Sequence, residues 1–120
     1  MKKMKSSRVL VILCAVFFAL GLPLVASANS PEKVDAFYNF NTKTLMVKVT
    51  HPTKNADKHF VSEVVVKKNG VVVQRAVYNK QDGDTPTYSY IMPATVDDVF
   101  EITATCSIHG SKTVKYQPGV

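Results

Sequence analysis

Short runs in which apolar and polar residues alternate, each closed by a turn signal, constrain the fold of this chain more than any other feature. In Phe100–Cys106 every second residue is apolar, and the residues between them are polar or charged. A period of two is typical of a β-strand with one buried face. Between two valine triplets, Asn69-Gly70 is a strong signal for a two-residue hairpin. No segment has a convincing helical period, so the sequence predicts a chain built from strands.

The alternating runs and the turn signals between them predict seven strands. These are Val34–Phe40, Thr44–Thr50, Phe60–Lys67, Val71–Tyr78, Thr87–Met92, Val99–Cys106 and Thr113–Tyr116. About seven short strands with a turn roughly every 8–12 residues predict an all-β fold, an immunoglobulin-like antiparallel β-sandwich. The tryptophan that marks antibody domains is absent from this sequence.

The first 28 residues have the features of a signal peptide. Four basic residues lie within the first eight, an uncharged apolar run follows over Val9–Leu20, and Ala26-Ser27-Ala28 is a small-x-small cleavage site. This pattern predicts cleavage after Ala28 and export to a periplasmic or extracellular location, with a single domain over residues 29–120. An uncleaved membrane anchor is the alternative. The apolar run is short for a membrane span and the cleavage site is good, which favours cleavage.

Loss of the leader changes what charge and cysteine content imply. The net charge falls from +6 for the whole chain to about +2, and no basic run remains that would indicate nucleic-acid binding. Cys14 leaves with the leader, so Cys106 is the only cysteine of the exported domain and cannot form an internal disulfide. Such a cysteine is a small buried apolar residue, a reactive thiol or a metal ligand.

All three histidines of the chain lie at predicted strand ends or in loops. His51 ends the second strand in the inward phase, His59 opens the third strand, and His109 follows Cys106 by three residues. A single histidine at such a position would ordinarily be a solvated loop residue. Together with the thiol, however, the three imidazoles predict a metal site at one rim of the sandwich.

The donor types leave three metals open. One thiolate with several imidazoles suits iron, copper or zinc. A structural zinc site would use all four side chains and leave no position open. A blue-copper site needs a weak axial ligand, and no methionine follows Cys106, while Met92 lies upstream on another predicted strand. Iron with one open position would support redox chemistry.

Three stretches of the sequence resemble the signature of the superoxide reductase family, the iron-binding domain of desulfoferrodoxin and neelaredoxin. They are His51-Pro52, His59-Phe60-Val61 and Cys106-Ser107-Ile108-His109-Gly110. The resemblance extends from about Glu32 to Tyr116. It implies an immunoglobulin-like sandwich with a mononuclear non-haem iron that reduces superoxide to hydrogen peroxide. The electrons would come from an external donor protein, because the chain has no second cysteine cluster.

The resemblance also implies roles for individual residues. His51, His59 and His109 would be equatorial ligands to ferrous iron, and Cys106 would be the axial thiolate opposite the open position. Glu32-Lys33 matches a mobile Glu-Lys pair of the family, in which the lysine attracts the superoxide anion and helps to place a proton-bearing water. The glutamate of that pair caps the ferric resting state. The alternative for these two residues is an ordinary solvated arm.

The sequence departs from the family pattern at three places. Val34 stands where the family has a fourth histidine ligand, Ser107 replaces an asparagine, and the loop between His51 and His59 is longer. Water, Glu32 or Asp35 could fill the missing ligand position, and a site with three histidines would bind iron less tightly.

Two further functions remain open from the sequence. The first is a metal-binding or electron-transfer module that uses His51, His59, Cys106 and His109 for copper or zinc without catalysing a reaction. The second is a structural or adhesive immunoglobulin-like domain in which Cys106 is merely buried.

Overall fold

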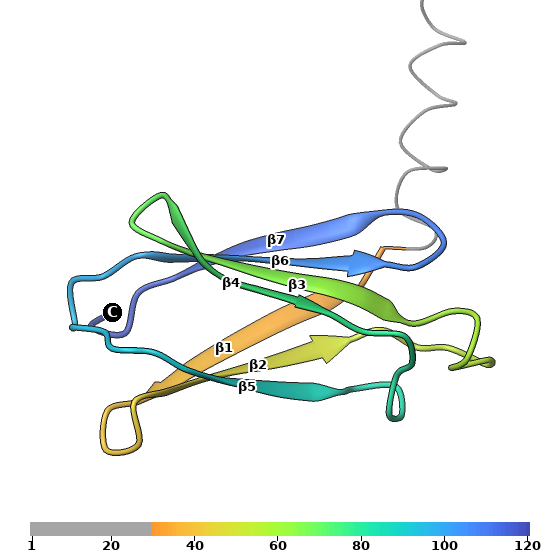
Figure 1. Ribbon diagram of the computed structural model, residues 1–120, viewed down its shortest axis with the longest axis horizontal. Coiled ribbons are helices and arrows are strands. Elements are labelled where there is room, and N and C mark those ends of the chain that lie inside the picture. The colour runs from red at the N-terminus through yellow and green to blue at the C-terminus, as the bar shows by residue number, and fades with distance from the viewer. Residues whose placement is uncertain (1–29) are drawn as a thin grey trace, which may run out of the picture.

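The computed structural model describes residues 30–120, which form two antiparallel β-sheets packed face to face (Figure 1). The predicted signal peptide lies outside the described residues. The strands are β1 (Lys33–Asn39), β2 (Thr44–Thr50), β3 (Val61–Lys68), β4 (Val71–Val77), β5 (Thr87–Ile91), β6 (Phe100–Cys106) and β7 (Ser111–Tyr116). Within this part of the chain, no helix has the length and apolar character needed to cross a membrane.

The strand order is that of an immunoglobulin-like sandwich. One sheet has the order β1-β2-β5 and the other β4-β3-β6-β7, with every neighbouring pair antiparallel. Three connections pass from one sheet to the other, namely β2–β3, β4–β5 and β5–β6. The predicted fold class is therefore confirmed. The predicted strand limits agree with the structure to within two residues at each end, and β2 agrees at both ends.

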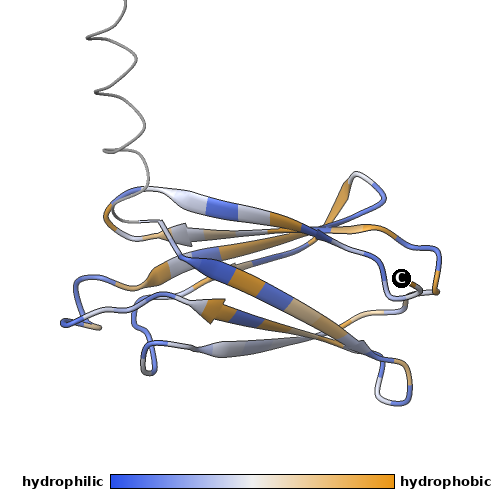
Figure 2. Cartoon of the chain, turned by 180° about the vertical axis from the view of Figure 1, so that it is seen from behind, coloured by the Kyte–Doolittle hydropathy of each residue, from blue (hydrophilic) through white to orange (hydrophobic). Residues whose placement is uncertain are grey.

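The core is formed by the inward-facing residues, which alternate with outward-facing residues along each strand. Along β2, Leu45, Val47 and Val49 are completely buried, and His51 continues the same phase just beyond the strand end. Along β6 the alternation runs from Phe100 to Cys106, with every second residue buried. Figure 2 shows the resulting alternation of apolar and polar residues along the strands. The inward-facing rows of β2 and β6 therefore extend to the end of the sandwich where His51 and Cys106 lie.

The opposite end of the sandwich is filled by aromatic rings. Phe100 stacks between two tyrosines, and its ring centroid lies 6.1 Å from that of Tyr38 and 6.3 Å from that of Tyr116. The Tyr38 hydroxyl donates to the carbonyl of Met92 at 2.6 Å, and its backbone N–H donates to the Tyr116 hydroxyl at 2.9 Å. Because these bonds satisfy the hydroxyls, the rings can be buried at little polar cost, and they hold the two sheets together away from the histidine end.

Two local features shape the connections. Asn69 and Gly70 both have positive φ, 53° and 84°, as a tight hairpin turn with two left-handed residues requires, so the predicted β3–β4 hairpin is confirmed. At the other end of β3, the pairing with β6 shifts register between Val61 and Glu63, directly beside Cys106. A bulge of this kind bends the strand and re-aims side chains at the sheet end.

The aromatic stack predicts a large difference between two phenylalanines. Phe100→Ala should lower the free energy of unfolding by about 3–5 kcal/mol, because it empties a fully buried ring site between two tyrosines. Phe37→Ala, at a side chain that is 61% exposed, should change it by no more than about 0.5 kcal/mol. Urea denaturation of both variants is the measurement. Equal losses would contradict the assignment of Phe100 as the core anchor.

Candidate metal centre

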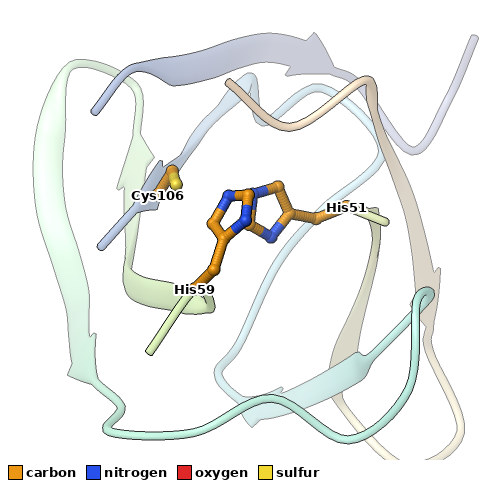
Figure 3. A group of neighbouring side chains, drawn as sticks. All are labelled: His51, His59 and Cys106. Carbon is orange, nitrogen blue, oxygen red and sulfur yellow. The ribbon is translucent and has the colours of Figure 1, made fainter. Parts of the chain in front are cut away.

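Three strand ends meet at one rim of the sandwich and bring together two histidines and the cysteine. His51 follows the last residue of β2, His59 lies two residues before β3, and Cys106 ends β6. Their ligand atoms all lie within 4.8 Å of one another, and Figure 3 shows both rings and the sulfur directed into the same space between the sheets. The site thus joins residues that are up to 55 positions apart in the sequence, the distance from His51 to Cys106.

The dimensions of this group fit a single transition-metal ion. Metal–nitrogen and metal–sulfur bonds are about 2.0–2.3 Å long, so two ligands on one ion lie no more than about 4.6 Å apart. Small side-chain rotations would bring the three donors to that separation. The two imidazole rings are 4.6 Å apart, nearly perpendicular at 89°. His51 and Cys106 are buried and His59 is half-buried, so the site has an inner wall and one more accessible side.

One atom of the group lacks a hydrogen-bond partner. His59 Nε2 is buried, and nothing in the described part of the chain bonds to it. Burying a polar atom without a partner costs free energy, and such atoms are rare in folded proteins. A metal ion bound to this lone pair would satisfy it. Since one ring nitrogen of His59 lies within 4.8 Å of a donor atom of His51 and of Cys106, this observation fits a metal ligand and does not fit a solvated loop histidine.

The backbone around Cys106 folds into a tight turn that also contacts the sulfur. The Cys106 N–H donates to the carbonyl of Gly110 at 2.9 Å, and the Ile108 N–H donates to Cys106 Sγ at 3.4 Å. Backbone N–H groups of this kind commonly orient a cysteine sulfur in a metal site. The turn therefore positions the sulfur.

Ser107 ties this turn to the histidine loop. Its hydroxyl accepts from the Phe60 N–H at 3.0 Å and donates to the Lys58 carbonyl at 3.1 Å, and its own N–H donates to the Phe60 carbonyl at 2.8 Å. These three bonds bracket His59 on both sides. The serine that departs from the family pattern thus links two of the three donor segments.

The loop from His51 to His59 is long but held at several points. Thr53 donates its hydroxyl to the His59 carbonyl at 2.7 Å, and the His59 N–H donates to the Asn55 carbonyl at 2.8 Å. The Thr53 N–H donates to the Asp84 carboxylate at 3.1 Å. The loop is therefore anchored to its own turn and to the β4–β5 connection, which fixes the backbone on which His59 stands.

Gln81, in the β4–β5 connection, was not among the predicted site residues. It is only 5% exposed, and its side-chain oxygen lies 2.8 Å from His51 Nδ1 and 3.0 Å from the Val61 backbone nitrogen. Its side-chain nitrogen donates to the carbonyls of His51 at 2.6 Å and Gly83 at 2.7 Å. Gln81 lies between the predicted strands Val71–Tyr78 and Thr87–Met92, and a lone glutamine between Lys80 and Asp82 carries no pattern that would single it out.

His109, the remaining predicted ligand, lies outside the group of three. It is exposed, in the turn between β6 and β7, and it does not belong to the cluster of converging donor atoms. Ligation by His109 stays a prediction. It would require the turn that follows Cys106 to carry the imidazole toward the other donors.

The predicted Glu-Lys pair lies close to the same rim in the fold. Glu32 and Lys33 are both exposed, and the Glu32 N–H donates to the carbonyl of Thr50, the residue before His51, at 2.8 Å. The Lys33 ammonium lies 3.6 Å from the Asp35 carboxylate. Their position at the start of β1 is compatible with either the predicted role or a solvated arm.

Val34 occupies an inward position on β1. It is buried in the core and is the Cα partner of Val49, two residues before His51 on β2. Its side chain thus belongs to the inward layer next to that of His51. In this chain an apolar residue packs there, where the family pattern has a histidine.

A separate cleft of about 700 Å³ lies along the β4–β5 connection and contains none of the predicted ligands. Tyr78 and Tyr88 line it, with ring centroids 4.5 Å apart. Burial, and next the neighbouring Tyr78, raise the pKa of Tyr88 to about 12, so this phenol stays neutral near physiological pH. Tyr88 therefore offers packing and a neutral hydroxyl but no base.

Comparison with known proteins gives a distant similarity of fold. No protein-family model matches the sequence, and no curated protein matches it. Among solved structures, the chain is similar to a superoxide reductase (neelaredoxin) from Ignicoccus hospitalis. The identity is 14%, the match covers 81% of this chain and 85% of that chain, and the TM-score is 0.48. At this level the similarity concerns the fold and assigns no residue.

The turn that follows Cys106 generates a prediction about two glycines. Gly110 has φ +91°, and a Cβ there would overlap Ser30 Oγ and lie 3.1 Å from Ser30 Cα, whereas a Cβ at Gly70, φ +84°, meets no atom within 4 Å. Both Gly→Ala changes should cost about 1–2 kcal/mol for the left-handed backbone. Only Gly110→Ala should cost more and also speed the reaction of Cys106 with a thiol reagent, because it disturbs the turn that holds the sulfur.

Chemical denaturation and thiol-labelling rates on the metal-free protein measure both effects. Equal stability losses and equal labelling rates for Gly70→Ala and Gly110→Ala would contradict the expected clash between a Cβ at position 110 and Ser30.

Proposed function

We propose that this chain is an exported mononuclear non-haem iron protein that reduces superoxide to hydrogen peroxide. The single observation that carries the proposal is that His59, whose buried Nε2 has no partner in the described part of the chain, converges with His51 and Cys106, with one donor atom of each within 4.8 Å of the others. The sequence resemblance of the three donor segments to the superoxide reductase family supports the choice of iron and of substrate. Export is part of the proposal, because the predicted signal peptide lies outside the described residues.

His51, His59 and Cys106 would hold the metal, with His109 as the fourth protein ligand that the resemblance implies. Bound ferrous iron would supply one electron to superoxide, two protons from water would complete hydrogen peroxide, and an external donor protein would return the electron. An octahedral iron held by four protein side chains would keep coordination positions for a small anion, which a tetrahedral four-ligand structural site does not.

The chain's own residues would attract the anionic substrate and leave one side of the metal group open to it. Lys33 is an exposed cation at the start of β1, next to Glu32, whose N–H bonds to Thr50, and it would attract an anionic substrate to this rim. The more accessible side of the group is that of His59, whereas His51 and Cys106 line the inner wall. The Ile108 N–H donates to Cys106 Sγ and would help to hold the sulfur in position for the metal.

A specific feature favours a second function, electron transfer at a copper site. Two histidines and one cysteine are the equatorial set of blue-copper proteins. Met92, the methionine considered for the weak axial position of such sites, is packed in the core, and its carbonyl accepts from the Tyr38 hydroxyl. Copper is therefore the competitor to test alongside iron.

The thiolate is the subject of the first functional prediction. The mature chain, purified without oxygen and loaded with Fe²⁺, should bind one iron, and its oxidised form should show a thiolate-to-iron charge-transfer band. Cys106→Ser should abolish that band, because a hydroxyl oxygen replaces the sulfur donor. Stopped-flow absorbance after mixing with superoxide should show rapid oxidation of the wild-type iron, with hydrogen peroxide as product.

Ser107→Ala provides a neighbouring variant that keeps the sulfur, and it should retain the charge-transfer band. A band that survives in Cys106→Ser would remove the cysteine from the metal. Iron that binds but does not react with superoxide would leave a metal site without the proposed reaction, and preference for copper with reversible one-electron cycling would favour the second function.

The histidines give a graded prediction. His51→Ala and His59→Ala should each weaken Co²⁺ binding, read from its absorption bands, by more than the roughly 10–100-fold typical of residues that only support a ligand. His109→Ala should weaken it less, because its exposed side chain must first be drawn to the metal. A loss for His109→Ala as large as for His51→Ala would place it in the primary ligand set, and no loss for His59→Ala would refute the site.

A further inference from the structure

The geometry points to Gln81 as the residue that positions His51 for metal binding, by fixing which ring nitrogen carries the proton. Gln81 lies between two residues that line the outer cleft, Lys80 and Asp82, but its own side chain is buried and turned inward. It contacts both the ring of His51 and the backbone carbonyl of that histidine. The inference rests on the proposed function only for its effect on the metal.

The orientation of the Gln81 amide follows from its neighbours. Two backbone carbonyls, those of His51 and Gly83, lie 2.6 and 2.7 Å from one end of the amide. Carbonyl oxygens can only accept, so the NH₂ group must face them. The amide oxygen must then face the other side, toward His51 Nδ1 at 2.8 Å and the Val61 N–H at 3.0 Å.

That orientation determines the tautomer of His51. An amide oxygen only accepts hydrogen bonds, so Nδ1 of His51 must carry its proton and donate it to Gln81. A neutral imidazole protonated at Nδ1 has its lone pair on Nε2. Nε2 is then the atom that can bind a metal, and the hydrogen bond at Nδ1 also fixes the plane of the ring. Histidine ligands ordinarily have such a partner on the non-ligating nitrogen.

Gln81 also links His51 to the strand beside the other donors. Its oxygen accepts from Val61, whose Cα is paired with that of Cys106 across the β3–β6 ladder. One buried side chain therefore spans from the His51 strand end in one sheet to the start of β3 in the other. With the amide's two N–H groups and its oxygen all bonded, the group has little freedom to rotate, which makes it a rigid support for the ring.

Two substitutions separate the positioning role from a merely structural one. Gln81→Met and Gln81→Glu, in ionised form, both lose the two bonds donated to carbonyls, so both should lower stability. Only Gln81→Glu keeps an oxygen that can accept from His51 and Val61. A structural role predicts the same behaviour for both variants, whereas a positioning role predicts that Gln81→Glu resembles the wild type at His51 and Gln81→Met does not. Gln74→Met, on the β4 edge strand, is the matched control.

The first measurement needs no metal. Long-range ¹H–¹⁵N correlation spectra of the metal-free mature chain at pH 8 should show His51 protonated at Nδ1 in the wild type, in Gln81→Glu and in Gln74→Met. In Gln81→Met the signal should shift to the Nε2–H tautomer that free imidazole side chains favour. Protonation at Nε2 in the wild type would overturn the inference without any variant, as would an Nδ1–H tautomer that persists in Gln81→Met.

The second measurement is Co²⁺ affinity of the same four proteins. Gln81→Met should bind about 10–100-fold more weakly than the wild type, and Gln81→Glu and Gln74→Met should stay close to it. Equal affinity of Gln81→Met and the wild type, with a changed tautomer, would refute the effect on metal binding. If none of the proteins bound Co²⁺ or iron, the proposed function would fail, while the tautomer of His51 would still test the contact with Gln81 by itself.

Discussion

The inward phase of β2 and β6 is the constraint on which the rest of the molecule depends. In each strand every second side chain enters the space between the sheets, and this row forms the core from Leu45 to Val49 and from Phe100 to Ala104. The same row continues to His51 and Cys106 at the rim. The packing that stabilises the fold is therefore also what directs two side chains that could bind a metal into one buried space.

Burying polar donors at the end of an apolar core requires partners for them, and the structure supplies most of these from loops. Gln81 satisfies the Nδ1 side of His51 and the first N–H of β3, while backbone groups of the turn after Cys106 bond to its sulfur and its N–H. His59 Nε2 is the exception among these atoms. Within the described part of the chain, a buried ring nitrogen without a partner, next to a second histidine and a cysteine, fits a ligand set arranged around an ion.

The sequence predicted the parts of this arrangement that follow from periodicity. A period of two placed the strands within two residues, and it put His51 and Cys106 in the inward phase at strand ends. Periodicity does not predict the conformation of loops. The conformation of the segment from His51 to His59 depends on single hydrogen bonds from Thr53 and Ser107, and Gln81 approaches from a connection thirty residues away in sequence. Such contacts depend on tertiary placement, which no local pattern encodes.

Val34 and His109 show how the site differs from the pattern that it resembles. A buried valine packs against the core in the layer next to His51, so β1 contributes packing where a ligand would be expected, and His109 is exposed on its turn. Two histidines and one cysteine are then the side chains that already converge. Were they to hold a metal, its affinity would depend on how firmly each of them is oriented, because the exposed His109 is not yet among them. The buried glutamine beside His51 and the serine beside the His59 loop are the groups that hold two of these segments in place.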